Sequence, residues 1–363
     1  MSKIEWTEKT WNPIIGCSIH SPGCIHCYAM PMAARIEAMN AAAKPGHETA
    51  PHYAGTTRKV NGQAVWTGKV ALAGDDVLLQ PLRRRKPTTW FVNSMGDLFH
   101  ERVPDEWIDR VFAVMALTPQ HTYQVLTKRA QRMRDYFCKD SRWRNRQIVV
   151  AHNGVAGVTV DFGPMPQLLP LPNVWLGVSA ERQQEADERI PLLLRTPAAI
   201  RFISAEPLLG PLDLTVPHID LGIGRFKCHP DLDLVIAGGE SGPKARLMHP
   251  RWVRSLRDQC AAAGIPFFFK QWGAWVPVCA LNDDEIDGLY HPAPQRDPEA
   301  RRRCKFETRV LHVDGSVHYP LAPQAFRAGS DPMTMFNVGK ARAGRLLDCV
   351  EHNAMPSHGR IAT

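Results

Sequence analysis

Between residues 88 and 117, a short apolar run is followed by an amphipathic stretch. The run TTWFVNSM predicts a strand over 88–95 that ends in small polar residues. In the following stretch, PDEWIDRVFAVMAL, apolar residues recur at helical spacing, and Pro104 suits the first turn of a helix. The two segments together predict a β-α unit.

This unit repeats along the chain as far as residue 273. Further strand candidates lie at 123–129, 174–180, 199–208, 233–240 and 266–273, and another lies just before Cys17. They lack strict polar alternation, which is typical of a parallel sheet covered by helices. About seven such strands predict the α/β class and favour a partial or complete (β/α) barrel. A doubly wound open sheet is the main alternative.

Shorter segments are predicted to be additions to this framework. Residues 30–43 are rich in Ala and Met and predict a helix, and Asn61-Gly62 predicts the turn of a short hairpin. Two stretches rich in Pro and Gly, 153–172 and 215–230, predict insertions.

After Trp275 the pattern changes. A charged loop with several prolines spans 282–303, Asp314-Gly315 predicts a hairpin turn, and NVGKARAGRLLD predicts a short basic helix. We therefore expect two units, a (β/α) barrel over 1–275 and a C-terminal appendage or lid over 276–363.

Positive charge is unevenly distributed along the chain. The net charge is +8, and the excess is concentrated in runs at Arg83–Lys86, Lys128–Arg146 and Arg301–Arg303. Such runs can follow phosphates, and Trp143 lies among arginines where it could stack on a base. Nucleic acid is therefore one candidate partner, and a solvated basic surface is the other interpretation.

The chain shows no targeting or membrane-spanning pattern. Its amino terminus has no apolar signal segment, and no run approaches the roughly 20 apolar residues that span a bilayer. The nine cysteines are an odd number, and those beyond residue 27 are scattered, which favours a reducing compartment. We therefore expect a cytoplasmic protein without a membrane partner.

Three cysteines, Cys17, Cys24 and Cys27, lie close together with the spacing C-x6-C-x2-C. Converging thiolates repel one another, so bringing them together requires a cation. A C-x2-C pair can reach one metal centre across a tight turn. Three sulfurs can bind three irons of a four-iron cluster and leave the fourth iron open to a small molecule. The spacing therefore predicts a 4Fe-4S cluster.

Two other interpretations of the cysteines remain open. In the first, His20 supplies a fourth ligand and completes a tetrahedral structural zinc site with Cys17, Cys24 and Cys27. In the second, the cysteines are buried or unpaired and bind no metal.

Polar residues follow nearly every predicted strand. The carboxyl ends of parallel strands meet at one edge, where ligands bind in α/β folds. The strand-end residues are Asn93, Ser94, Asp97, Thr127, Lys128, Ser179, Glu181, Ser204, Glu206, Glu240, Ser241, Lys270 and Gln271. We expect the functional site at this edge.

The segment NPIIGC...CIHCYA resembles the cluster loop of radical S-adenosylmethionine (SAM) enzymes, and particularly that of enzymes of the spore photoproduct lyase type. More of the chain resembles a phage and bacterial family of radical-SAM-like proteins with a three-cysteine motif. The matching segments include FVNSMGDLFHE, VWLGVSAE, ISAEPLLGPLDL, IAGGESGPKARLMHP, PFFFKQWG and NVGKARAGRLLD. The usual spacing is C-x3-C-x2-C, so the longer first gap departs from the superfamily pattern.

The resemblance implies a partial (β/α)6 barrel in which SAM binds the open iron. His26 occupies the position before the third cysteine, which lies near the adenine in that superfamily. By position, Ser94 and Asp97 lie where the superfamily holds the methionyl amine. Ser179, with Glu181 or Arg182, lies where it holds the ribose or the carboxylate of SAM. Asn93 and Glu206 are further candidate SAM contacts.

Two strand-end residues are candidates for catalysis. Lys270 ends a run of three phenylalanines, and its side chain either points into a cavity or reaches outward to solvent. Glu240 follows a Gly-Gly pair, and Glu240 and Glu206 are each candidates for the site or for the scaffold. Trp272, beside Lys270, is expected to line a substrate pocket.

These expectations lead to two hypotheses. In the first, the protein is a radical SAM enzyme: an electron donor reduces the cluster, and cleavage of SAM yields a 5′-deoxyadenosyl radical that abstracts hydrogen from the substrate. Nucleic acid or a nucleotide is the candidate substrate. In the second, the protein is a noncatalytic, zinc-containing nucleic-acid-binding protein.

Overall fold

The computed structural model describes residues 4–44, 47–139, 151, 154, 169–215, 231–292 and 302–356. At its centre is a seven-stranded sheet in which all neighbouring strands are parallel. Its strands are β1 (Lys9–Trp11), β6 (Thr89–Val92), β7 (Thr122–Thr127), β8 (Val174–Ser179), β9 (Ile200–Ala205), β10 (Leu234–Gly238) and β11 (Phe267–Gln271). Six of them coincide with predicted strands. The residues just before Cys17, where the first strand was expected, form β2 (Ile14–Ile15) outside this sheet, and β1 lies upstream of it.

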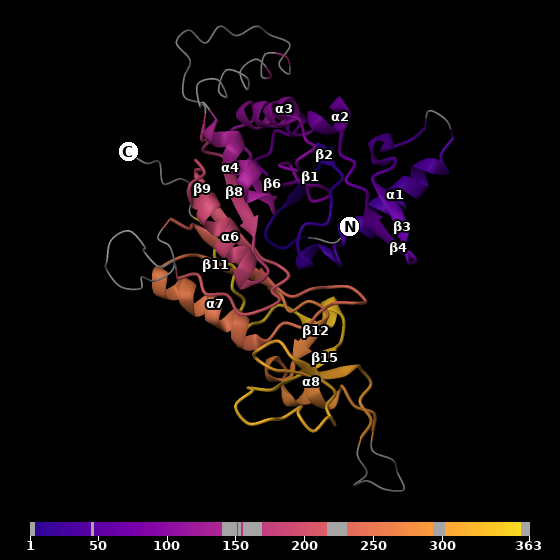
Figure 1. Cartoon of the computed structure of the whole chain (residues 1–363), viewed down its shortest axis with the longest axis vertical. Coiled ribbons are helices and arrows are strands. Elements are labelled where there is room, and N and C mark those ends of the chain that lie inside the picture. Colours follow the sequence, from indigo (N-terminus) through magenta and orange to yellow (C-terminus); the bar gives the residue numbers. More distant parts are fainter. Residues whose placement is uncertain are drawn as a thin grey trace.

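The strands stand in the sheet in the order in which they occur in the chain. The helices that connect them are α3 (Asp105–Ala116), α4 (Ala130–Cys138), α6 (Gln183–Leu194) and α7 (Pro250–Ala263). Right-handed crossovers in one direction place these helices on a single face, and the sheet curls into a half-barrel (Figure 1). The order never reverses as it would in a doubly wound sheet, so that alternative is wrong. The α/β class is confirmed, and the sheet has seven strands where six units were expected.

The two faces of the sheet bury different clusters. On the outer face, residues such as Val125 and Leu176 pack against Phe112 and Leu193 of the helices. The inner face carries a separate apolar cluster that includes Phe91, Trp175, Phe202, Ile236 and Phe268. Trp6 from the amino-terminal segment completes this cluster, with its ring centroid 4.7 Å from that of Phe91. The inner face is therefore a filled core at this level.

The segment between β1 and β6 forms a small subdomain. It contains β2 (Ile14–Ile15), which pairs with β5 (Ala71–Leu72), and the hairpin of β3 (Thr57–Val60) and β4 (Gln63–Trp66). Asn61 and Gly62 form the hairpin turn with φ of 49° and 76°. The predicted helix is α1 (Ala29–Ala41). Three short elements, η2 (Pro51–Tyr53), α2 (Asp75–Leu78) and η3 (Pro81–Arg83), complete the subdomain.

A second, antiparallel sheet begins at Trp275, near the expected boundary. Its strand order is β12-β15-β13-β14, with β12 (Trp275–Pro277), β13 (Thr308–Leu311), β14 (Val317–His318) and β15 (Met333–Asn337). Asp314-Gly315 lies in the predicted turn between β13 and β14. Short helical elements are η4 (Val278–Ala280), α8 (Asp283–Asp287) and α9 (Lys340–Ala343). The predicted basic helix is thus reduced to the single turn of α9.

The last described residues return to the half-barrel. The backbone N–H of Phe269 donates to the carbonyl of His352 at 2.9 Å, and Asn353 forms a bridge with Phe268. The expected insertion at 215–230 lies, except for Thr215, outside the described residues, as does most of the one at 153–172. Trp143 and its neighbouring arginines also lie outside them. Within the described ranges, no helix combines the length and the apolar character needed to cross a membrane.

Candidate metal centre

The three clustered cysteines line one cavity of about 120 Å³ at the carboxyl ends of β6, β7 and β8. The polar residues that share this lining are Ser18, Asn93, Ser94, Asp97, Thr127, Lys128, Arg129 and Ser179. The structure therefore brings the cysteine loop and four of the predicted SAM contacts, Asn93, Ser94, Asp97 and Ser179, to one place.

The backbone of the cysteine loop runs unusually close to its neighbours. Gly16 has φ of 89°, and a Cβ there would lie 2.0 Å from the carbonyl oxygen of Lys69. After Gly16 the chain forms η1 (Pro22–Cys24), and α1 begins two residues beyond Cys27. Only glycine combines this backbone conformation with this approach, so the entry to the loop is fixed by Gly16.

Arg129 holds the Cys17 end of the loop. Its side chain is 2% exposed, and its Nη1 lies 3.0 Å from Oδ2 of Asp97 and 3.7 Å from Sγ of Cys17. Its Nη2 donates to Oγ of Ser18 at 2.9 Å, and its Nε donates to the carboxylate of Glu101 at 3.0 Å. One guanidinium thus connects the loop to the ends of β6 and β7.

Glu181 holds the middle of the loop. It is fully buried, and its carboxylate accepts hydrogen bonds from Ser21 Oγ at 3.1 Å, from Arg189 Nη1 at 3.1 Å and from Lys128. Burial opposes ionisation, but Lys128 and Arg189 outweigh it and hold the pKa of Glu181 below its ordinary value. A Cβ on Gly23 would lie 2.2 Å from Oε1 of Glu181, so this contact requires glycine.

Glu240, a predicted catalytic residue, holds the far end of the loop. Its carboxylate lies 3.0 Å from Nδ1 of His26 and accepts a hydrogen bond from Nε of Arg246 at 2.9 Å. Arg246 also donates to the carbonyl of Pro22 at 3.0 Å. The structure therefore places Glu240 and His26 in contact with each other, and Glu240 supports the loop from the end of β10.

Lys270 and Glu206 form an ion pair of 3.0 Å farther along the sheet. Their side chains are 18% and 13% exposed, and neither lines the cysteine cavity. Trp272 does not line it either: its ring packs against Phe269 with centroids 5.1 Å apart, and its Nε1 donates to the carbonyl of Leu346. These three predicted residues are thus separate from the thiols.

The environment of Cys17 and Cys27 disfavours ionisation of their thiols in the absence of a cation. Burial raises the pKa of Cys17 to about 12, with a further rise from Asp97 and an opposing effect of Arg129. Burial also raises the pKa of Cys27. Because thiolates are the species that bind metals, ionisation here depends on a positively charged group among the sulfurs.

Asn93 lines the same cavity and carries an unsatisfied donor. Its residue has φ of 58°, its Oδ1 accepts from the backbone N–H of Ile14, and its Nδ2 is buried without a hydrogen-bond partner. Buried donors without a partner are rare and call for an explanation such as a bound group. Asn93 therefore combines a place in the cavity lining with a donor that no described residue satisfies.

The cavity offers three sulfur donors, Cys17, Cys24 and Cys27, to a metal group. Among the described residues, no group of three or more His, Cys, Asp or Glu side chains is placed to hold one metal ion, and His20 is exposed. In a cluster, each cysteine binds a different iron, so the sulfurs need not converge on one point. The cavity volume of about 120 Å³ is below the roughly 300–1,000 Å³ of pockets that bury a whole organic ligand. As it stands, the cavity therefore encloses at most part of an organic ligand.

Three arginines of the site, Arg129, Arg189 and Arg246, are not among the residues predicted from the sequence. Arg129 is the last residue of the predicted strand 123–129 and belongs to the basic run that starts at Lys128. Arg189 lies in a predicted helix and Arg246 follows the predicted strand 233–240, and the sequence predicts no site role for either. The basic run at Arg83–Lys86 precedes β6, so it lies at the opposite end of the strands from the thiols.

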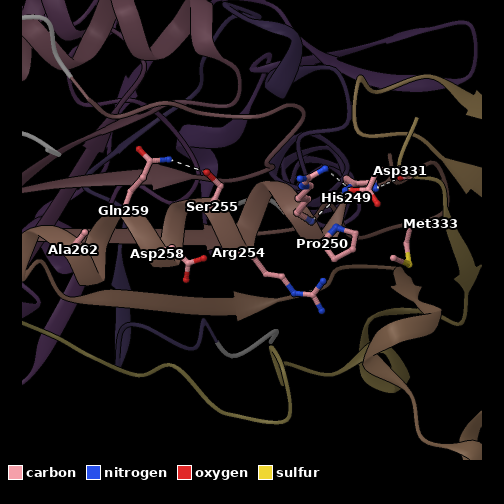
Figure 2. A pocket seen from close by; sticks show the side chains of 10 residues that line it. His249, Pro250, Arg254, Ser255, Asp258, Gln259, Ala262, Asp331 and Met333 are labelled. Atoms are coloured by element: carbon pink, nitrogen blue, oxygen red, sulfur yellow. Dashed lines mark hydrogen bonds and ion pairs between the residues drawn. The ribbon is translucent and has the colours of Figure 1, made fainter. Parts of the chain in front are cut away.

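A larger cavity lies along α7, beside the antiparallel sheet. It measures about 790 Å³ and is lined by residues of α7 together with Asp331 and Met333 (Figure 2). Its charged groups already have partners: Arg251 lies 3.0 Å from Asp331, and Arg254 lies 2.6 Å from Asp348. It contains none of the predicted site residues.

The fold and the cavity define an α/β half-barrel protein with a thiol-lined site at the carboxyl ends of its parallel strands. A comparison with protein families matches residues 1–356 to the family described as Protein of unknown function (DUF5131), and the chain belongs to it. No curated protein and no solved structure matches the chain.

Proposed function

We propose that this protein is a radical SAM enzyme in which Cys17, Cys24 and Cys27 bind a 4Fe-4S cluster. The observation that carries the proposal is that these thiols line one cavity at the carboxyl end of a parallel half-barrel. This is the edge at which α/β folds bind ligands. When bound, the cluster would supply one-electron reduction of SAM and, through it, hydrogen-atom abstraction from a substrate.

The polar residues around the cavity differ in how far their groups are already occupied. Asn93 has a donor without a partner. Ser94 donates to Oδ1 of Asn12 at 3.1 Å but lines the cavity with Ser179, and we assign these three residues to SAM. Asp97 accepts from Thr127 at 2.7 Å and pairs with Arg129 at 3.0 Å. We therefore assign Asp97 to positioning the loop rather than to the methionyl amine.

The other predicted site residues receive supporting roles. Glu181 and Glu240 hold the cysteine loop through Ser21 and His26. We assign Lys270, a predicted catalytic residue, and Glu206, predicted as a SAM contact, to the substrate, because their ion pair lies beyond the thiols at the carboxyl ends of β9 and β11. A nucleic acid or nucleotide substrate stays a prediction from the sequence.

The decisive measurement is the iron and acid-labile sulfide content after anaerobic reconstitution, together with the electron paramagnetic resonance spectrum of the reduced protein. We expect a brown protein with equal amounts of iron and sulfide, and a spectrum that changes when SAM is added. Cys17→Ala should lose the cluster, whereas Cys138→Ala, at an exposed cysteine of α4, should retain it.

Two results would separate the parts of the proposal. A colourless protein with one tightly bound zinc would replace it with the structural zinc alternative. The cluster spectrum could instead be unchanged by SAM, with no 5′-deoxyadenosine formed in the presence of a reductant. This result would support the cluster and contradict the binding of SAM. The small cavity volume makes this second result the sharper test.

A further inference from the structure

We infer that Arg129 and Asp97 together set the charge at the Cys17 sulfur and thereby the reduction potential of the bound cluster. This inference rests on the proposed function, because it needs the cluster. It assigns Arg129 and Asp97 as positioning residues that act through Cys17.

The geometry of Arg129 is that of a fixed charge. Its guanidinium is 2% exposed and is held by Asp97, Glu101 and Ser18 on different nitrogens. The planar fork of arginine makes such divided contacts possible, whereas a lysine ammonium is a point charge on a flexible stem. Arg129 therefore cannot move away from Cys17 without giving up its other contacts.

Cys17 differs from the other two thiols in the hydrogen-bonding neighbour of its sulfur. Over the described ranges, Arg129 is the charged side chain within hydrogen-bonding distance of a clustered sulfur, at 3.7 Å from Cys17. Cys24 has the neutral hydroxyl of Ser21 at 3.9 Å instead. The six-residue gap after Cys17 thus leaves room for a cation at one corner of the site.

The sign of the effect follows from electrostatics. Reduction adds one negative charge to a cluster, and a fixed cation beside a cysteine sulfur favours that state, while an anion disfavours it. Hydrogen bonds and net charge around the sulfurs are known determinants of cluster potential, and low exposure strengthens them. Removing Arg129 should make the potential more negative, and neutralising Asp97 should make it more positive.

The experiment measures the midpoint potential of the reconstituted cluster by spectroscopic redox titration in full-length variants. Arg129→Met should shift the reduction equilibrium at least tenfold toward the oxidised state, which is about 59 mV for one electron. Asp97→Asn should shift it in the opposite direction. Arg132→Met, in α4 just after Arg129 but paired with Asp105, is the matched control and should leave the potential unchanged.

A merely structural role would give a different result. Loss of packing would lower the iron content in both variants without opposite shifts in potential, and equal potentials in wild type, Arg129→Met and Asp97→Asn would overturn the inference. If Arg129→Met fails to fold, Arg129→Lys keeps a charge and should give a shift in the same direction but smaller. A wild-type protein without iron and sulfide would instead refute the proposed function.

Discussion

The inner face of the half-barrel differs between its two levels. At the lower level the side chains are apolar and buried, as with Phe91, Trp175 and Phe202 around Trp6. Beyond the carboxyl ends of these strands, the chain buries Asp97 and Glu181, which follow β6 and β8, and Arg189 of α6. The half-barrel thus has a hydrocarbon core on the strands themselves and an ionic network in the segments that follow them.

The two levels contribute differently to stability. Burying apolar area stabilises the fold by about 25 cal/mol per Å², whereas burying an ion pair costs desolvation that its attraction often only offsets. A purely structural protein would be as stable with apolar residues at the upper level. The retained charges are therefore best explained by what they position, namely the cysteine loop.

The largest effect is expected at the lower level. Phe202→Ala should destabilise the protein by about 3 to 5 kcal/mol, because the ring is fully buried and packs so closely on Gly177 that a Cβ there would lie 2.5 Å from its Cζ. Urea unfolding measures the loss. Phe326→Ala, at a side chain that is 59% exposed, is the control, and equal effects of the two would contradict a filled inner core.

Disrupting the ionic network of the upper level should destabilise the protein slightly less than Phe202→Ala does. Glu181→Gln keeps the shape but leaves Lys128 and Arg189 without their carboxylate, and we expect a loss of about 3 kcal/mol, near the lower end for a broken buried pair because Lys128 is 19% exposed. Glu188→Gln, at an exposed site of α6, the helix that follows Glu181, should change little. If Glu181→Gln leaves the free energy of unfolding unchanged, the network is unimportant for stability.

The same carboxylate predicts a pH dependence. The folded-state pKa of Glu181 lies below its ordinary value of 4.5, so its contribution is complete above that pH and is lost as the pH falls through the lower folded value. Unfolding free energies measured from pH 7 to pH 3 should decline more steeply in wild type than in Glu181→Gln. Parallel profiles would show that Glu181 is not the group responsible.

Sequence reasoning succeeded at the lower level for a physical reason. A strand buried on both faces must be apolar over its whole length, so runs such as those at 174–180 and 199–208 were visible as strands and coincide with β8 and β9. Asn61-Gly62 was likewise readable, because its turn needs two residues with positive φ. Local constraints of this kind leave a direct trace in the sequence.

The upper level was only partly predictable. The spacing of Cys17, Cys24 and Cys27 identified the loop, since clustered thiols are costly without a metal. Its supports come from residues about 110 to 220 positions away, such as Arg129 to Ser18 and Arg246 to Pro22. No local pattern distinguishes a buried arginine from a solvated one, because the partner that makes burial tolerable is distant in the chain.

A smaller effect is expected where the loop touches the network. Gly23→Ala would place a Cβ 2.2 Å from Oε1 of Glu181, and Glu181 cannot move because two cations hold it. We expect destabilisation of about 1 to 3 kcal/mol, as for overpacking, and increased access of a thiol reagent to Cys24. Gly210→Ala, where a Cβ would meet nothing within 4 Å, is the matched control and should be neutral in both measurements.

The smallest effect on stability is expected at Glu240, at the outer edge of the upper level, where the change should be confined to the cysteine loop. Glu240→Gln weakens the contacts with His26 and Arg246, whose side chains are 24% and 29% exposed, so solvent screening limits the loss to about 1 kcal/mol. Hydrogen exchange should nevertheless become faster over residues 22–27, because Glu240 and Arg246 hold that segment from the end of β10. Asp331→Asn, which weakens an exposed pair with Arg251, should leave exchange in the loop unchanged. If Glu240→Gln also leaves it unchanged, the loop is held by Arg129 and Glu181 alone, and the ionic level of the half-barrel is confined to β6 through β8.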